Sequence, residues 1–308
     1  MKMKTKLTKQ VITLFMALSL PFVALSASDA TLRLNVSKGD QVKFSSTSEQ
    51  VITQTINGME QVINQNQIYE YTIAVTENDA NGNMVATVTF NRVATEIKMQ
   101  GMEMKFDSND ESDAPLANPQ FQIFNAMVNQ SVTTLISPLG KVLEVNGVDK
   151  MRDKMAGESN PQLAQMVNSA ITDASVKQIF EGVFIAFPAK KLKANDSWSE
   201  NKSIENQFTL NTMCTYTVKA ITNDEVNLSL SSTLATVPGN KSTVQGMEVT
   251  YNLFGTINGT VTVDRAKGFV TESVLEQNIN GSFSGDMMGQ KLDVPMTIHS
   301  KATTKKIK

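Results

Sequence analysis

The residues that could perform covalent catalysis are few, and the sequence gives them no partners. His299 is the single histidine and Cys214 the single cysteine. A Ser–His or Cys–His pair would need His299, which stands in the alternating pattern of a strand. Segment 281–285 carries phenylalanine where a nucleophile elbow carries serine. Ser199 and Lys202 have a serine–lysine spacing but lack the companion motifs. We therefore expect a protein that is not an enzyme.

Metal ligands are equally sparse. Zinc needs several histidine, cysteine or carboxylate ligands. The acidic segment 107–113 alternates oxygen donors, but it lacks the glycine and the glutamate of an EF-hand, so we expect a solvated loop. The chain has 17 methionines, which could hold copper(I), offer a deformable surface to apolar ligands, or fill gaps in the core. We favour gap filling, and we expect no metal site and no cofactor.

Binding of an apolar ligand is the chemistry that the sequence favours. Four large apolar side chains recur at helical spacing in the centre of the chain, and the only tryptophan follows them. The tryptophan is expected to anchor the helical segment to a sheet, with ligand stacking as the alternative. Together they predict a pocket for a lipid or another apolar small molecule. The candidate residues are Met166, Phe180, Phe184, Phe187 and Trp198.

The elements that position these residues are a helical segment and two β-units. Asn160-Pro161 is a typical helix start, Pro188 a stop, and apolar residues recur between them at intervals of three and four. The segment 71–107 is written a second time as 216–252, with matching Tyr-Thr, Asn-Asp and Gly-Met-Glu anchors. Asn-Gly dipeptides, typical of type I′ hairpin turns, begin at Asn57, Asn81, Asn146, Asn258 and Asn280.

The fold class expected is α+β, mainly β. Duplicated antiparallel β-meander units would form a curved sheet, with the central helical segment packed on it. We favour one sheet over two separate ones, because unpaired edge strands favour aggregation. The expected divisions are a signal peptide at 1–27, an N-terminal β-unit at 28–147 with a short helix near 119–129, a helical segment at 148–190 and a C-terminal β-unit at 191–308. The first strand is expected over 31–44, with a turn at 38–40.

Residues 1–27 have the pattern of a secretory signal peptide: lysines, then an apolar stretch, then small residues. The apolar stretch is shorter than the roughly 20 residues of a membrane span, so we expect cleavage, no stable membrane insertion, and a periplasmic or extracellular protein. Without a cysteine at the cleavage site, it would not be a lipid-anchored lipoprotein. The chain has 28 Lys+Arg and 30 Asp+Glu. The only charged residues that cleavage removes are lysines, so the mature chain has a more negative net charge. We therefore expect no binding to nucleic acid.

The layout resembles a family of exported bacterial proteins known as a domain of unknown function. The resemblance rests on Leu32-Arg33-Leu34 before Lys38-Gly39-Asp40, on the Gly-Met-Glu turns, on 138–145, and on Asn195-Asp196-Ser197-Trp198. It covers nearly the whole mature chain and implies no activity and no functional residues. A looser similarity is to periplasmic lipoprotein carriers, in which helices close a curved antiparallel sheet over an apolar cavity.

These observations favour a non-enzymatic exported protein that binds a lipid or another apolar ligand beneath its helical segment. The alternative is a structural or scaffold protein of the cell envelope that contacts a protein partner. The two hypotheses share a fold and differ in whether the core beneath the helices is open or filled.

Overall fold

The computed structural model describes residues 29–110, 119–156, 164–165, 167–168, 171–205, 209–239, 241–244, 247–287 and 290–308. In this part of the chain, no helix has the length and apolar composition that a membrane span requires. Met166 and the helix start at 160–161 lie outside the described residues.

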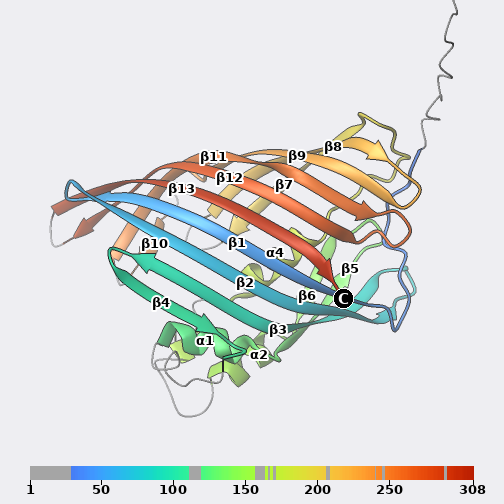
Figure 1. Ribbon diagram of the computed structural model, residues 1–308, viewed down its shortest axis with the longest axis horizontal. Coiled ribbons are helices and arrows are strands. Elements are labelled where there is room, and N and C mark those ends of the chain that lie inside the picture. Colours follow the sequence, from blue (N-terminus) through green and yellow to red (C-terminus); the bar gives the residue numbers. More distant parts are fainter. Residues whose placement is uncertain are drawn as a thin grey trace, which may run out of the picture.

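One large, curved antiparallel sheet forms the body of the molecule (Figure 1). The strand order is β6-β5-β3-β2-β1-β13-β12-β11-β9-β8-β7, with β4 paired to β3 and β10 paired to β11. The strands are β1 Gln41–Ile56, β2 Met59–Asn78, β3 Met84–Met99, β4 Met102–Asp107, β5 Ser131–Ile136, β6 Val142–Asn146, β7 Ser197–Glu205, β8 Thr209–Ile221, β9 Glu225–Thr236, β10 Lys241–Val244, β11 Met247–Asp264, β12 Val270–Met287 and β13 Gln290–Ile307.

The two β-units are joined through the last strand. β13 pairs with β1 along one edge and with β12 along the other, so both units lie in one sheet, as expected. Within the sheet, β6-β5-β3-β2-β1 and β12-β11-β9-β8-β7 run in the same order, which agrees with an internal duplication.

The duplication extends to the hydrogen bonds of the turns that open the two units. Gly39, with φ 95°, donates its N–H to Val75 O at 2.9 Å, and Asn195, with φ 70°, donates to Val218 O at 2.8 Å. In each turn the next residue, an aspartate, accepts the N–H of the residue three positions before it at 2.9 Å. Asparagine tolerates this left-handed conformation better than most residues, so it can replace glycine here.

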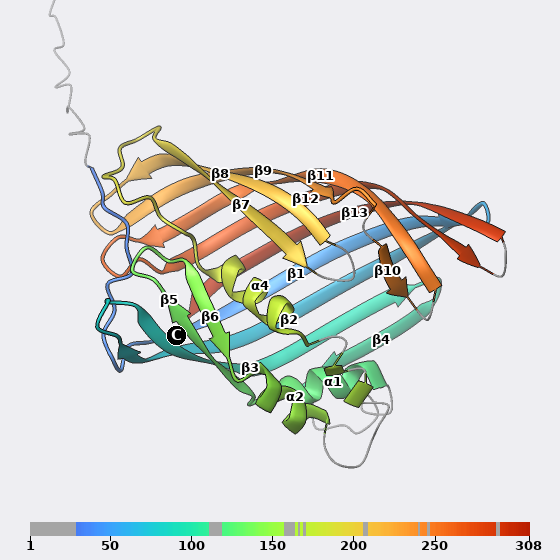
Figure 2. The same ribbon diagram turned by 180° about the vertical axis from the view of Figure 1, so that it is seen from behind.

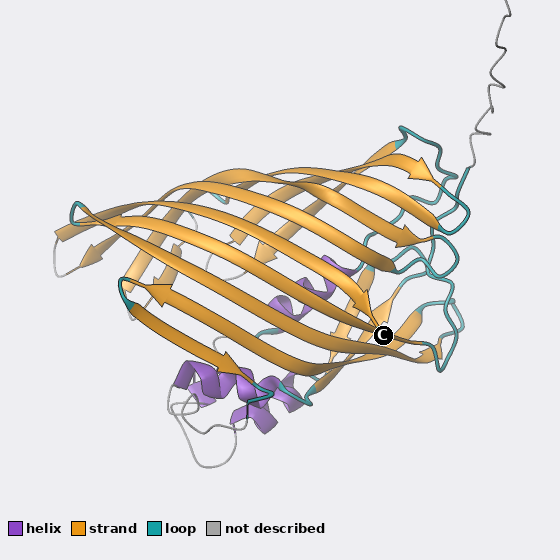
Figure 3. Ribbon diagram, viewed as in Figure 1, coloured by secondary structure: helices purple, strands orange, loops and turns teal. Residues whose placement is uncertain are grey.

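The helices that the structure bounds within the described residues are α1 Pro119–Met127, α2 Val148–Ala156 and α4 Asp173–Val183. Helix α4 lies on the concave side, between the edge strands β6 and β7 (Figure 2). Helices α1 and α2 pack against each other beside β3 and β5 (Figure 3). The short helix expected near 119–129 is therefore present.

The expected strand over 31–44 is wrong in its first half. Residues 31–37 form no strand and instead cross the ends of both β-units. Leu34 N–H donates to Pro138 O at 2.8 Å, and Asn35 N–H donates to Lys267 O at 3.0 Å. Leu32 is buried in the core of the second unit and Leu34 in that of the first. The alternation that imitates a strand arises because every second side chain fills one of two cores.

Two of the five Asn-Gly dipeptides lie inside strands. Asn57-Gly58 has positive φ at both residues, as a type I′ turn requires, whereas Asn258-Gly259 lies inside β11 and Asn280-Gly281 inside β12. A Cβ on Gly259 would lie 2.0 Å from Val274 O of the neighbouring strand, and one on Gly281 would lie 1.9 Å from Asn252 O. Both glycines are therefore required by a close backbone approach.

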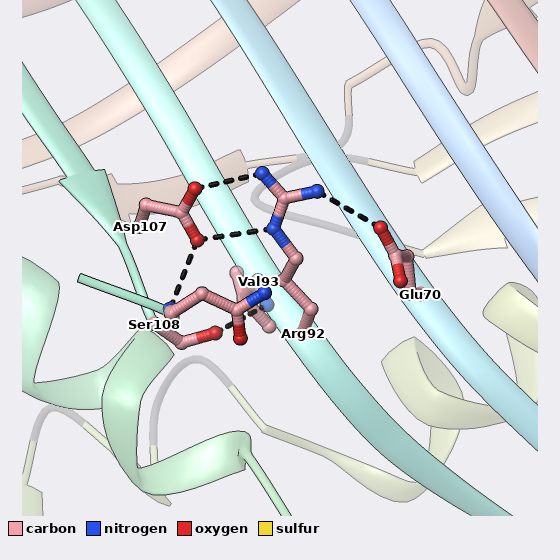
Figure 4. Close-up of polar contacts among 6 residues, drawn as sticks. Glu70, Arg92, Val93, Asp107 and Ser108 are labelled. Atoms are coloured by element: carbon pink, nitrogen blue, oxygen red, sulfur yellow. Dashed lines mark hydrogen bonds and ion pairs between the residues drawn. The ribbon is translucent and has the colours of Figure 1, made fainter.

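On the convex face, an ion-pair network fixes the bulge between β2 and β3 (Figure 4). Arg92 donates Nε to Asp107 Oδ1 at 3.0 Å and Nη2 to Asp107 Oδ2 at 2.7 Å, and it donates Nη1 to Glu70 Oε1 at 2.9 Å. Ser108 Oγ accepts the Val93 N–H at 3.0 Å. These contacts tie the end of β4 to the middle of β3.

This network predicts a loss of stability in acid. The hydrogen bonds from Arg92 hold the pKa of Asp107 below its ordinary value of 3.8, so the folded state favours the ionised carboxylate. The contribution of Asp107 to the free energy of unfolding is complete above its ordinary pKa, and it disappears as the pH falls through the lowered pKa of the folded state. Because the pair is partly exposed, we expect about 1 kcal/mol or less. In thermal unfolding, the midpoint temperature of the wild type should be higher than that of Asp107→Asn at pH 7, and the two midpoints should converge near pH 2. A constant difference over this range would contradict the assignment.

Candidate ligand site beside helix α4

Helix α4 presents two different faces, which the spacing of its residues determines. Val176, Phe180 and Val183 are buried in the core of the first β-unit. A second stripe, at spacings of three and four residues, faces a cavity of about 410 Å³ between α4 and the edge strands β6 and β7. This stripe consists of Ala174, Lys177 and Glu181 of α4 and of Phe184 directly after the helix, and the opposite wall is formed by residues 200–203 of β7.

A second cavity, of about 580 Å³, adjoins the first along β7. The two share Asn201, Lys202 and Ser203. The second cavity extends over β8 and β9, where its lining includes Thr212 and Leu234. Since Thr212 pairs with both Lys202 and Leu234, these three side chains lie in one row on the concave face of the sheet.

This row continues across the sheet as aliphatic residues. From Leu234 it passes through Gly255 to Ile279, Ile298, Ile52 and Ile63, each paired with the next. From Ile52 to Leu234 it measures about 20 Å along the sheet, at about 4.8 Å per strand. The neighbouring row is polar and uncharged from β2 to β12, with Gln65, Gln50, Ser300 and Gln277, and it continues through Ile257 of β11. The concave face thus joins an apolar row to a charged end at Lys202.

The charged end contains two acid–base pairs. Lys202 Nζ donates to the backbone oxygen of Glu181 at 3.0 Å and lies 3.4 Å from Glu200 Oε2. Lys177 Nζ lies 3.6 Å from Glu181 Oε1. The side chains of Lys202 and Glu200 are only 15% and 26% exposed. This arrangement can bind a polar group next to an apolar one, and it offers charges of both signs.

Of the predicted site residues that the structure describes, one lines a cavity and others are buried in the core. Phe184 lines the first cavity and packs against Phe269. Phe180 and Phe187 are buried among other core side chains and are not among the lining residues of the described cavities. Trp198 donates Nε1–H to Ala186 O at 3.0 Å and stacks on Tyr216 with ring centroids 5.3 Å apart, so it anchors the chain after α4 to β8.

The charged residues of the site were missed by sequence reasoning. In the sequence, Lys202 is notable only for its serine–lysine spacing from Ser199, and Glu200 belongs to no motif of its own. Alternation along β7 separates that serine–lysine pair: Ser199 bonds Thr215 Oγ1 at 2.9 Å on the convex side, whereas Lys202 faces the concave side. The signal that could have found them is a Glu–x–Lys pair on the inner face of a strand that follows a helix.

The single cysteine and the single histidine take part in packing and in side-chain pairing. Cys214 is buried, as expected, between Thr212 and Ser232. His299 Nδ1 forms a hydrogen bond with Asn278 Oδ1 at 2.6 Å on the convex face. Among the described residues, no three His, Cys, Asp or Glu side chains gather closely enough to hold a metal ion.

Comparisons with solved structures find remote similarity. The chain is 10% identical to lipovitellin, from a structure of its lipid–protein interactions, with a TM-score of 0.48. The superposition covers 89% of this chain but only 26% of lipovitellin. The chain is 7% identical to OccK5 (OpdH) of Pseudomonas aeruginosa, with a TM-score of 0.23 over 89% of this chain and 100% of that one. OpdL of the same organism is 6% identical, with a TM-score of 0.24 over 87% and 99%.

Sequence comparison is more direct. Among curated proteins, none matches the chain. A model described as a family of unknown function (DUF6263) matches residues 81–270, which is more than half of the chain. The match includes α4, β7 and the strands that line both cavities. The protein therefore belongs to the DUF6263 family.

Proposed function

We propose that this protein is a non-enzymatic, exported binding protein for an amphiphile, a molecule with one polar and one apolar end. The observation that carries the proposal is the pair of adjoining cavities that share Lys202, one charged and the other continuous with an aliphatic row. Each volume falls within the range of about 300–1,000 Å³ typical of small-molecule sites.

The apolar end of the ligand would lie over Leu234 and the aliphatic cluster beside it. This cluster has a buried base of Leu210, Leu253, Ile279 and Ile298 and a partly buried margin that includes Ile52, Ile257 and Met296. One acyl chain spans half of the hydrocarbon core of a bilayer, and the whole core is roughly 30 Å thick. The row, at about 20 Å, is longer than that half. One lipid chain is therefore the apolar group that fits best.

The polar end would lie beside α4, where Phe184 forms the boundary between the aromatic core and the charged cavity. Phe180 and Phe187 would support the site by holding α4 and the chain after it, and Trp198 would report on it. The pattern of residues 1–27 supports export, after which the ligand would be met in the periplasm or outside the cell.

Replacing Ile257 by glutamine should weaken lipid binding. Ile257 is partly buried on the concave face of β11, beside the aliphatic row. Amide dipoles in place of an aliphatic surface should reduce affinity by about tenfold, since burial of an aliphatic side chain contributes about 1.5–3 kcal/mol. Binding would be measured by titration with a fluorescent fatty-acid probe and, independently, by the change in Trp198 emission.

Phe254→Gln is the matched control. Phe254 lies three positions earlier on the same strand, is 57% exposed and points to the convex face. Its replacement should leave probe affinity unchanged. Equal losses in both variants, or wild-type protein that takes up no probe and carries no extractable lipid, would contradict the proposal.

A scaffold role is the alternative that such a negative result would favour. It is supported by exposed methionines at two hairpin tips, Met59 after the β1–β2 turn and Met102 after the β3–β4 turn. Apolar side chains at exposed tips are suited to contact with another protein.

A further inference from the structure

The ion pairs in the cavity beside α4 are longer than most of the ion pairs in the described part of the chain, although Lys98–Glu103, at 3.7 Å, is longer still. Lys202–Glu200 and Lys177–Glu181 measure 3.4 and 3.6 Å. On the outer face of the sheet, Arg92–Asp107 measures 2.7 Å and Lys105–Glu103 measures 2.6 Å. Charge-assisted hydrogen bonds between such groups are normally about 2.7–2.9 Å long. The charged groups of the cavity are thus close to one another without being fully engaged.

Glu200 is the clearest case. Its Oε2 atom is buried and has no hydrogen-bond partner among the described residues, and the neighbouring Lys202 ammonium directs a hydrogen bond to the backbone oxygen of Glu181 instead. A buried carboxylate oxygen without a donor is unfavourable, and such atoms in native proteins usually have a partner. A donor that is not part of the chain, such as an ammonium or hydroxyl group of a ligand, would satisfy it.

The signs of the lining charges restrict the ligand further. The residues that line the cavity include Lys141, Lys177 and Lys202 together with Glu181 and Glu200. Because the lysines outnumber the glutamates, a purely cationic group would be repelled overall, and a purely anionic group would leave the two glutamates without a complement. A group that carries both charges can place each opposite its complement.

We propose that this cavity binds a zwitterionic head group, with its ammonium N–H on Glu200 Oε2 and its anionic oxygens facing Lys177 and Lys202. The inference rests on the proposed function, because it assigns the polar end of the same amphiphile. The simplest such head is phosphoethanolamine. Phosphocholine carries the same charges but no N–H donor, and phosphoglycerol carries no cation, so these two heads separate the hydrogen bond from the charge.

The test uses the mature protein and short-chain phosphatidylethanolamine, phosphatidylcholine and phosphatidylglycerol below their micelle concentrations. Soluble glycerophosphoethanolamine represents the head group without acyl chains. Binding is measured by calorimetry and by Trp198 emission. We expect phosphatidylethanolamine to bind about tenfold to a hundredfold more tightly than the other two, which is the range for a hydrogen bond to a charged group.

Glu200→Gln should reduce this preference to about twofold or less, because it keeps the shape of the side chain and removes its charge. Glu248→Gln is the control, since it also removes a carboxylate from a lysine pair, at 2.6 Å from Lys241, but on the exposed β10–β11 hairpin. It should keep the full preference.

The outcomes separate this inference from the broader proposal. Equal binding of the three lipids by the wild type would overturn the head-group assignment and leave lipid binding intact. Binding of glycerophosphoethanolamine that depends on Glu200, without binding of any lipid, would support the head-group assignment and refute the acyl-chain site. Absence of both would refute both.

Discussion

Replacement of Phe180 by alanine should destabilise the protein by about 3–5 kcal/mol, the range measured for large aromatic side chains in cores. Phe180 is fully buried on the inner face of α4 and belongs to the core that the helix shares with the first β-unit. The loss of stability has two parts. The variant no longer gains the free energy of moving the ring from water into the core on folding, and a cavity is left beneath the helix. Urea denaturation followed by far-UV circular dichroism would measure it.

The neighbouring residue supplies the control. Ile179 lies on the same helix and is 40% exposed. Its replacement by alanine should cost less than about 1 kcal/mol, because most substitutions outside the core have small effects. Similar losses in the two variants would show that α4 does not pack on the sheet through this face.

Replacement of Gly259 by alanine should have the second large effect, at about 3 kcal/mol or more. The added Cβ would lie 2.0 Å from Val274 O and 2.9 Å from Leu275 Cα. Both are backbone atoms of the adjacent strand, so the clash cannot be relieved by rotation of a side chain. Overpacking usually costs about 1–3 kcal/mol, and displacement of a paired backbone belongs at the upper end. The shift in the thermal midpoint would measure it.

Gly101→Ala separates this steric effect from conformational strain. Gly101 has φ 83°, which alanine tolerates poorly, but a Cβ there would meet nothing within 4 Å. We expect a cost of about 1–2 kcal/mol. If Gly259→Ala costs no more than Gly101→Ala, the close approach of β11 and β12 is not required for the fold.

The sheet could be predicted from the sequence because its main signals are local. Alternation of apolar and polar residues, the Asn57-Gly58 turn and the proline at the start of α1 each act over a few neighbouring residues. The internal duplication was visible for the same reason, since each copy keeps its own turns.

The errors came from features that depend on distant parts of the chain. Asn57-Gly58 and Asn258-Gly259 have identical local chemistry, and only the backbone of Val274 makes the second a site of close strand approach. Leu32 and Leu34 alternate like strand residues because they enter two cores built from other segments.

The candidate site was foreseen only in its helix. The apolar stripe that includes Phe180 and Phe184 was visible, but of these two only Phe184 lines the cavity, and Phe180 lies in the core. The opposite wall of the cavity depends on strand pairing. Lys202 reaches the aliphatic row because β7 pairs with β8, and β8 with β9. A sequence pattern gives the face on which Lys202 lies, but it does not give its neighbours across the sheet.

The position of β13 has a consequence for biogenesis. β13 is the last described strand in the chain and pairs with the first, β1, from Lys43 opposite Ile307 to Gln54 opposite Met296. Contacts of such high sequence separation give a high contact order, and folding that depends on them is slow. The central pairing cannot form until β13 has been synthesised, so a nascent chain would keep its sheet open until then. Under the export proposed above, this delay would be favourable, because a chain that has not completed its sheet remains competent for translocation.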